Sequence, residues 1–177
     1  MNSVIKAIVF FIMGLTVIFY GGAYLLPGEA RVERAIEIGA PPEKVFAIVG
    51  DLRRMPEWSP WVKADPKVAF TFEGPEQGVG QTMRWASNNP MVGSGSEKVT
   101  DLVANERIVT EIDYGEFGTA SSTIKIAPAG SGTRVTRTFT SSLPGVVDRW
   151  AGLMIDRSVG AEYERGLENL KELAERP

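Results

Sequence analysis

The sequence predicts an α+β protein in which a curved, seven-stranded antiparallel sheet wraps around one long C-terminal helix. Two short helices are expected between the first and second strands, and a transmembrane helix at the N-terminus. Three observations support this fold class. Apolar residues alternate with a period of two through most of residues 31–140, fall at helical spacing through residues 155–174, and fill a charge-free run near the N-terminus. A chain of 177 residues has room for a single domain behind that run.

The N-terminal apolar run extends from Ala7 to Leu26 without a charged side chain. As a helix it would be roughly 30 Å long, which matches the hydrocarbon core of a bilayer, and the Pro-Gly pair that follows would end it. A cleaved secretory signal is the main alternative, because Lys6 precedes the run and residues 28–30 resemble a small-x-small cleavage site. The run is longer than the roughly 7 to 15 apolar residues usual for a signal. A buried helix of a soluble protein is a further alternative.

These features predict a single-pass membrane anchor within residues 1–30 and a folded domain in residues 31–177. Positive charges lie on both sides of the run, with Lys6 before it and Arg31 and Arg34 after it, so the positive-inside rule gives little direction. The very short head before the run is the arrangement of an uncleaved signal. It favours a domain outside the cytoplasm.

The first strand and two short helices are expected directly after the anchor. Residues 32–38 alternate in the way of a half-buried strand, and the sequence Gly-Ala-Pro-Pro at residues 39–42 ends it. Pro42 suits the first turn of a helix that ends at Gly50. A second short helix is expected over residues 51–55.

The segment MPEWSPW, residues 55–61, places two of the four tryptophans three residues apart and frames them with prolines. Proline fixes its own φ and favours extended conformations at the residue before it, so Pro56 and Pro60 predict a stiff, irregular connection. Such connections usually lie at the surface. Trp58 and Trp61 would there need either a core to pack into or a ligand to cover.

Six further strands follow, separated by turn sequences rich in Gly, Asn and Pro, which predicts an antiparallel meander. Helical spacing then predicts a long amphipathic helix from Ile155 to Ala174, preceded by a shorter helical piece near residues 146–154. A straight helix does not fit flush against the apolar face of a curved sheet, so we expect a ligand cavity between them. The expected strands cover residues 68–72, 83–85, 98–103, 108–114, 120–126 and 135–139.

Composition excludes several classes of function. The chain contains no cysteine and no histidine, which removes zinc sites built on these residues, thiolate nucleophiles and every catalytic dyad or triad that needs an imidazole. The formal net charge is -3 with both signs interspersed, so no basic face is expected and nucleic acid is not an expected partner. We expect no metal and no cofactor.

Four motifs carry a family resemblance. They are the stretch from residue 32 to 61 that begins VERAIEIGAPP, the VGSG at residues 92–95, the GTRVT at residues 132–136, and GLENLKELAE from Gly166. They resemble the polyketide cyclase/dehydrase branch of the START and birch-allergen-like (SRPBCC) helix-grip superfamily, over about residues 31–176. The resemblance implies a helix-grip fold with an interior cavity for an apolar or amphipathic small molecule. It does not imply catalysis, because the superfamily includes lipid carriers, hormone receptors and aromatase/cyclases.

Eight residues are candidates for contact with a ligand. In the arrangement of this family the two tryptophans of MPEWSPW would form a lip at one end of the cavity, unless they only seal the core. Four aromatic residues on the strands and turns would line the concave face of the sheet, although aromatics at strand period are often plain core. The last helix contributes a tyrosine, and the last strand an arginine. The candidates are Trp58, Trp61, Trp85, Tyr114, Phe117, Arg137, Phe139 and Tyr163.

Arg137 is the charged member of this set. It alternates in phase with Val135 and Phe139, which would direct a buried guanidinium toward the apolar side of the sheet. A buried cation requires a partner. The partner would be a ligand, or else Glu97 or Glu111; alternatively the register changes and Arg137 is solvated.

Two functions from different classes fit these features. The first is a membrane-anchored binding module that holds a hydrophobic or amphipathic small molecule, lipid-like or aromatic. The second is an enzyme of the cyclase or dehydrase type that uses Asp, Glu, Tyr or Arg for acid-base chemistry. Glu111 and Asp113 fall opposite the apolar stripe of their strand, so no carboxylate is expected in the cavity and binding is favoured. A scaffold domain filled by its own side chains is a third possibility. Gly166, within the last helix, is expected to let that helix approach the sheet closely.

Overall fold

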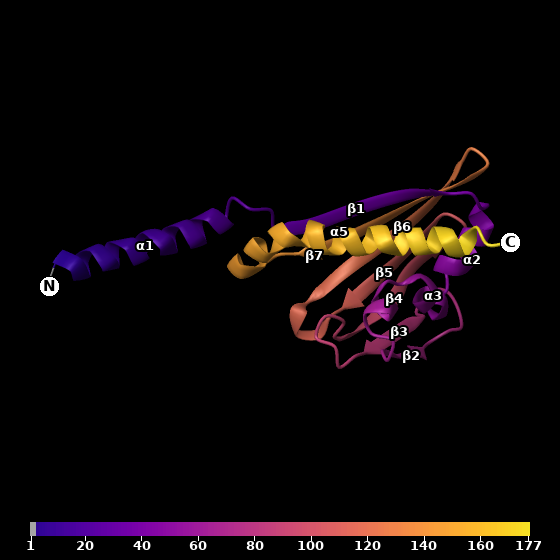
Figure 1. Ribbon diagram of the computed structural model, residues 1–177, viewed down its shortest axis with the longest axis horizontal. Coiled ribbons are helices and arrows are strands. Elements are labelled where there is room, and N and C mark those ends of the chain that lie inside the picture. Colours follow the sequence, from indigo (N-terminus) through magenta and orange to yellow (C-terminus); the bar gives the residue numbers. More distant parts are fainter. Residues whose placement is uncertain (1–2) are drawn as a thin grey trace.

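The computed structural model describes residues 3–177 and shows a long α-helix that extends from a body made of one sheet and several helices (Figure 1). The elements follow the order predicted from the sequence. They are α1 (Ser3–Ala23), β1 (Glu29–Ile38), α2 (Pro42–Val49), η1 (Leu52–Arg54), α3 (Met55–Trp58), α4 (Trp61–Ala64), β2 (Ala69–Glu73), β3 (Thr82–Ala86), β4 (Ser94–Val103), β5 (Arg107–Asp113), η2 (Gly115–Phe117), β6 (Thr119–Ala129), β7 (Gly132–Ser142) and α5 (Val146–Ala174).

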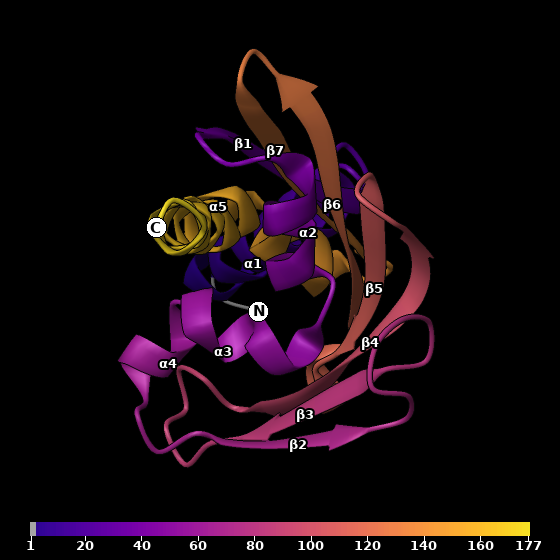
Figure 2. The ribbon, with the colours of Figure 1, turned by 90° about the vertical axis from the view of Figure 1, so that its right-hand side faces the viewer.

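The seven strands form one antiparallel sheet with the order β1-β7-β6-β5-β4-β3-β2. β1 pairs with β7 along its whole length, from Glu29 opposite Ser142 to Ile38 opposite Thr133, so the first and last strands are neighbours. Figure 2 shows the sheet curving around α5. α2 lies between α5 and the sheet, and α3 lies above β3 and β2 (Figure 2). This arrangement confirms the predicted fold class.

Three details differ from the sequence prediction. α5 is one continuous helix from Val146, without a separate first piece, and Asp148 accepts a hydrogen bond from the backbone N–H of Gly145 at its start. The segment at residues 55–61 is irregular only at Ser59 and Pro60, because residues 55–58 form the single-turn helix α3 and Trp61 begins the single-turn helix α4. Proline is tolerated in the first turn of a helix, where its missing N–H has no partner to lose. β4 begins at Ser94, upstream of the predicted start at residue 98.

The main core lies at the end of the body where α2 is inserted between α5 and the sheet. It consists mainly of buried aliphatic side chains, and burial of each Val, Leu or Ile among them contributes roughly 1.5–3 kcal/mol. Because α2, α5 and the sheet all contribute, this end has three layers. Its members include Ile38, Val45, Ile48, Val49, Val99, Ile108, Val135, Leu167, Leu170 and Ala174.

β1 is tied to α5 through Arg34. The guanidinium of Arg34 donates to Glu164 (Nε to Oε1, 2.6 Å) and to Asp156 (Nη1 to Oδ1, 3.1 Å). It lies directly over the backbone of Gly160, so that a Cβ at residue 160 would clash with it. The two carboxylates are largely exposed, so the ion pairs orient the strand and helix more than they stabilise them.

α1 is the only helix of the described residues 3–177 that is long and apolar enough to cross a membrane. Its side chains are exposed along its length except that of Ala23. A signal sequence near an N-terminus can meet the same criteria of length and composition. The structure therefore confirms an apolar N-terminal helix.

Candidate functional site

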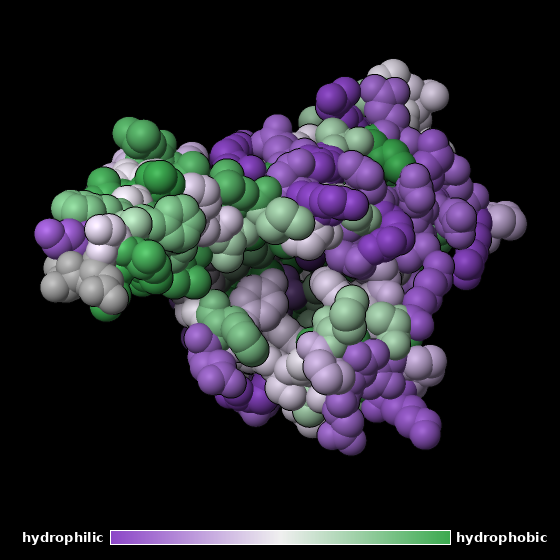
Figure 3. Space-filling model, turned by 60° about the vertical axis from the view of Figure 1, so that its left-hand side comes forward, coloured by the Kyte–Doolittle hydropathy of each residue, from purple (hydrophilic) through white to green (hydrophobic). Residues whose placement is uncertain are grey.

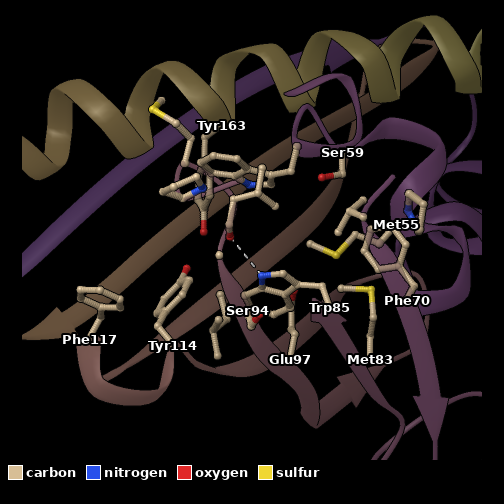
Figure 4. A pocket seen from close by; sticks show the side chains of 18 of the residues that line it. Met55, Ser59, Phe70, Met83, Trp85, Ser94, Glu97, Tyr114, Phe117 and Tyr163 are labelled. Carbon is tan, nitrogen blue, oxygen red and sulfur yellow. Dashed lines mark hydrogen bonds between the residues drawn. The ribbon is translucent and has the colours of Figure 1, made fainter. Parts of the chain in front are cut away.

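A cavity of about 280 Å³ lies between the concave face of the sheet and the helices α3 and α5 (Figure 4). Apolar side chains form most of its wall, among them Met55, Phe70 and Met83. These residues come from α3, β2 and β3, at the end of the sheet opposite to β1. The cavity thus occupies the part of the sheet that α2 does not cover.

Two aromatic rings form the sheet-side wall. The indole of Trp85 meets the ring of Tyr114 edge to face, with the ring centres 6.0 Å apart. Trp85 Nε1 donates to the backbone oxygen of Val92 at 3.3 Å, which fixes the orientation of the indole. The indole crosses the neighbouring strand at Gly95, where a Cβ would lie only 2.5 Å from Trp85 and from the oxygen of Asp113. Glycine at residue 95 is therefore required for this wall.

The inner end of the cavity is polar. Glu97 and Arg137 both line it, and both are buried, at 4% and 6% exposure. Thr110 Oγ1 lies 2.6 Å from Glu97 Oε1 and 3.4 Å from the backbone oxygen of Ser122. Buried ionisable groups in a cavity are typical of functional sites.

Arg137 is held by rings and one hydroxyl. Its guanidinium carbon lies 4.0 Å from the ring centre of Tyr163 and 5.1 Å from that of Trp58, in cation–π contact with both. Nε donates to Ser122 Oγ at 3.4 Å, and the hydroxyl of Tyr163 donates to the same oxygen at 3.2 Å. The cation is thus positioned without a carboxylate in direct contact.

Glu97 has a perturbed acidity. Burial raises the pKa of its carboxyl, and the opposing influences of Arg137 and of the Thr110 hydrogen bond do not cancel the rise. The Thr110 hydroxyl donates to Glu97 Oε1. Burial also raises the pKa of the Tyr114 hydroxyl, which keeps it a hydrogen-bond donor at neutral pH.

Glu97 and Arg137 do not form an ion pair with each other, since none of the pairs within 4.0 Å in residues 3–177 joins them. A second, smaller cavity of about 10 Å³ adjoins both, and Trp58 also lines it. That volume is close to the minimum for one water molecule. The indole N–H of Trp58 is buried and has no partner among the described residues. The guanidinium of Arg137 and the indole N–H of Trp58 can therefore donate to an oxygen placed at the inner end of the cavity.

The structure places six of the eight predicted residues on the cavity: Trp61, Trp85, Tyr114, Phe117, Arg137 and Tyr163. Trp58 is not at the lip. It is 3% exposed and packs in the main core beside Arg137. Phe139 belongs to a separate buried cluster, where its ring meets that of Tyr163 edge to face at 6.3 Å. Arg137 does point to the apolar side of the sheet, as its phase predicted.

The sequence prediction missed Glu97 as a carboxylate in the cavity. With the strand predicted to start at residue 98, the sequence offers Glu97 only as a partner for Arg137. With the strand starting at Ser94, Glu97 alternates in phase with Gly95 and with Val99, which is 0% exposed. That alternation was the available signal. The cavity therefore does contain a carboxylate, contrary to the expectation from the sequence.

No group of three or more Asp, Glu, His or Cys side chains that could hold a metal occurs in residues 3–177. The side chains available to bind a molecule in the cavity instead carry aromatic rings, hydroxyls, one carboxyl and one guanidinium. They suit an organic molecule with an apolar body and a small polar part.

Comparison with solved structures supports the fold. A protein from Chromobacterium violaceum is 19% identical, with 86% of this chain and 100% of that chain covered and a TM-score of 0.60. Ara h 8.0201 is 15% identical, with 83% and 98% covered and a TM-score of 0.59. The di-domain ARO/CYC StfQ of the steffimycin biosynthetic pathway is 16% identical, with 83% and 51% covered and a TM-score of 0.62. At these identities the likeness concerns the fold alone.

Among curated proteins, none matches the sequence significantly. A family model described as "Polyketide cyclase / dehydrase and lipid transport" matches residues 29–175, which is the whole body of the molecule without α1. The helix-grip resemblance of the sequence motifs is thereby confirmed. The chain belongs to the polyketide cyclase/dehydrase and lipid transport family.

Proposed function

We propose that the protein is a membrane-anchored module that binds a hydrophobic or amphipathic small molecule, lipid-like or aromatic, in the cavity between sheet and α5. The observation that carries the proposal is a largely apolar cavity with a buried acid and a buried cation at its inner end, unpaired with each other. Such a combination is typical of small-molecule sites, where apolar walls provide affinity and a few polar groups fix orientation.

The polar groups indicate the chemistry of the ligand. Arg137 is a donor only, the Tyr114 hydroxyl can donate, and the indole N–H of Trp58 has no acceptor among residues 3–177. Most of the available groups are therefore donors. We infer a ligand whose apolar body contacts Phe70 and Trp85 and whose head carries an acceptor oxygen, as in a ketone or a carboxylate.

We further propose that α1 anchors the domain of residues 31–177 in the membrane. Its length and exposed apolar surface support a span. An anchored domain would stay close to the pool of hydrophobic molecules in the bilayer.

The experiment is native mass spectrometry of the full chain released from nanodiscs made with host membrane lipids. We expect a small-molecule adduct that is lost on denaturation. Trp61→Ala is expected to lower its occupancy about 5- to 10-fold, because a half-exposed ring on the cavity wall is removed. The free energy of unfolding should change by less than about 1 kcal/mol.

Val79→Ala is the matched control, since Val79 is exposed and does not line the cavity. It should leave occupancy unchanged. A clean apo mass for the wild-type chain, or an equal loss of adduct in both variants, would contradict the binding proposal.

Glu97 supports a second candidate function, an acid-base enzyme. A buried carboxyl with a raised pKa, beside a cation and a tyrosine hydroxyl, suits proton transfer at a carbon next to a carbonyl, as in dehydration. Incubation with a β-hydroxy ketone of fitting size distinguishes the two functions. Formation of the enone by the wild-type chain but not by Glu97→Gln supports the enzyme, whereas an unchanged ketone supports binding alone.

A further inference from the structure

The C-terminal end of α1 is docked on the first turns of α5. Trp150 of α5 donates from Nε1 to the backbone oxygen of Phe19 at 3.0 Å, and the two rings stack with centres 6.1 Å apart and planes 10° from parallel. Gly22 leaves room for this indole, because a Cβ there would lie 3.0 Å from it. Arg149 donates from Nη1 to the oxygens of Ala23 (3.3 Å) and Leu26 (3.4 Å), which satisfies carbonyls at the end of α1. The direction of α1 relative to the domain is thereby determined.

The first turns of α5 expose apolar side chains next to this contact. Val147, Leu153 and Met154 are 68%, 58% and 59% exposed. Val147, Trp150 and Met154 are three and four residues apart, so they share one face of the helix with the α1 contact. We call Val147, Leu153 and Met154 the collar. Its apolar surface continues that of α1.

The mouth of the cavity carries the two most exposed large apolar side chains of residues 29–177, Phe117 at 87% and Met91 at 80%. Both line the cavity, and both lie in turns: Phe117 between β5 and β6, Met91 between β3 and β4. We call them the lip. Figure 1 shows that the β5–β6 turn and the start of α5 lie toward the end of the body from which α1 leaves.

Figure 3 shows this end of the molecule. Hydrophobic residues extend from α1 onto the adjoining part of the body, and a hollow opens below them. Hydrophilic residues cover most of the rest of this view. An exposed apolar surface of this kind is unfavourable in water and indicates a contact surface.

We propose that the collar and the lip rest in the headgroup region of the bilayer that α1 spans, so that the cavity opens onto the membrane and its ligand enters from there. This inference rests on the proposed function, including the anchor. The bilayer is the occupant that fits, because the collar continues the surface of α1 and the docked α1 presents the same end of the body to the membrane. Interfacial apolar side chains of this kind enter the headgroup boundary by roughly 5–10 Å.

The chain has no cysteine, which makes single-cysteine labelling clean. We would label Phe117→Cys, Met91→Cys and Val147→Cys with an environment-sensitive dye in the full chain, reconstituted in phosphatidylcholine vesicles that contain a lipid with a nitroxide near the headgroup. The control is Ser131→Cys in the β6–β7 turn, which Figure 1 shows at the opposite end of the body. We expect at least about twofold stronger quenching at the three test sites than at the control, since the quencher acts only near the interface.

The outcomes separate the two proposals. A chain that floats with the vesicles while its three test sites are quenched no more than Ser131 overturns this inference and leaves the anchor standing. A chain that does not float overturns both. Dye shielding that grows with the protein-to-lipid ratio, in place of quenching by the lipid, would show that a second copy covers the surface, and would also overturn the inference.

The docking of α1 supplies a second test. Replacing Arg149 and Trp150 together by Ala is expected to leave flotation intact but to reduce quenching at Phe117→Cys to the level of the control, because α1 would no longer orient the body. Arg165→Ala, an exposed change elsewhere on α5, should have no effect on quenching. Unchanged quenching in the Arg149 and Trp150 double variant would show that this contact does not orient the mouth.

Discussion

The two ends of the space between sheet and α5 differ in what fills them. At one end α2 inserts Val45, Ile48 and Val49 between α5 and the sheet, and the core is closed. At the other end only the single-turn helices α3 and α4 cross the opening, and a cavity of about 280 Å³ remains. Figure 2 shows α2 on the side of α5 and the shorter helices above β2 and β3. A straight helix cannot fill a curved sheet alone, so the placement of one additional helix decides which end is core and which is cavity.

The chemistry of the two ends follows the same division. The closed end is mainly aliphatic, and the side chains that α2 contributes there are apolar. The open end combines half-buried aromatic rings with Glu97 and Arg137, whose burial requires hydrogen bonds and ring contacts. We therefore expect mutations at the closed end to affect mainly stability and mutations at the open end to affect mainly ligand binding or acidity.

The largest effect should follow from Leu170→Ala at the closed end. Leu170 is 0% exposed on α5, and truncation of such a side chain costs about 2–5 kcal/mol through lost burial and the cavity left behind. Urea denaturation would measure the loss of unfolding free energy. The fraction of protein still folded should retain its adduct in native mass spectrometry. Loss of the adduct without loss of stability would show that the two ends are not separate.

Glu97→Gln tests the acidity of the open end. The folded pKa of Glu97 lies above the unfolded value of about 4.3, so between these two pH values the folded state holds a proton that the unfolded state has released. Wild-type stability should therefore fall as pH rises through this window, by roughly 1.4 kcal/mol for each unit of pKa difference. The contribution is fully present below the unfolded pKa and lost above the folded one.

Glutamine does not titrate, so the variant lacks the pH-dependent contribution of Glu97. Its free energy of unfolding relative to that of the wild type should therefore increase with pH across the same window. Denaturation curves at several pH values would measure the difference. Glu111→Gln, on the exposed face of β5, controls for the loss of one negative charge. A wild-type-to-Gln difference that does not change with pH would show that Glu97 is not a perturbed acid.

The smallest effects come from two glycines of α5. A Cβ at Gly166 would lie 3.5 Å from Pro60 and 3.7 Å from Trp58, which is ordinary contact, so Gly166→Ala should stabilise the helix by up to about 1 kcal/mol. Gly160→Ala should stabilise the protein less than Gly166→Ala, because its Cβ would displace the Arg34 guanidinium from the two carboxylates that hold it. Thermal denaturation of both variants would measure the contrast. Equal shifts of the two melting temperatures would contradict it.

The glycine pair also shows where sequence reasoning assigned the right role to the wrong residue. Gly166 was expected to permit a close approach of the helix, but the tight approaches to α5 in the body occur at Gly160, under Arg34, and at Gly152, under Leu143. A glycine within a helix indicates that a side chain or backbone of another segment approaches the helix closely. Which glycine a partner reaches depends on the rotation of the helix, and helical periodicity of the apolar residues sets that rotation only within a broad stripe.

The sequence by itself determined the number of the strands and their order along the chain, the long terminal helix and the apolar N-terminal helix; for Arg137 it favoured the inward direction but left a solvated side chain open. These follow from the period of apolar residues, which is local. Tertiary structure alone decided that Trp58 enters the core while Trp61 stays on the cavity wall, and that Glu97 faces Arg137 without pairing with it. It also decided that α1 docks on Trp150. Each of these outcomes depends on which distant segment packs against a residue. The pattern of polar and apolar residues along the sequence does not identify that segment.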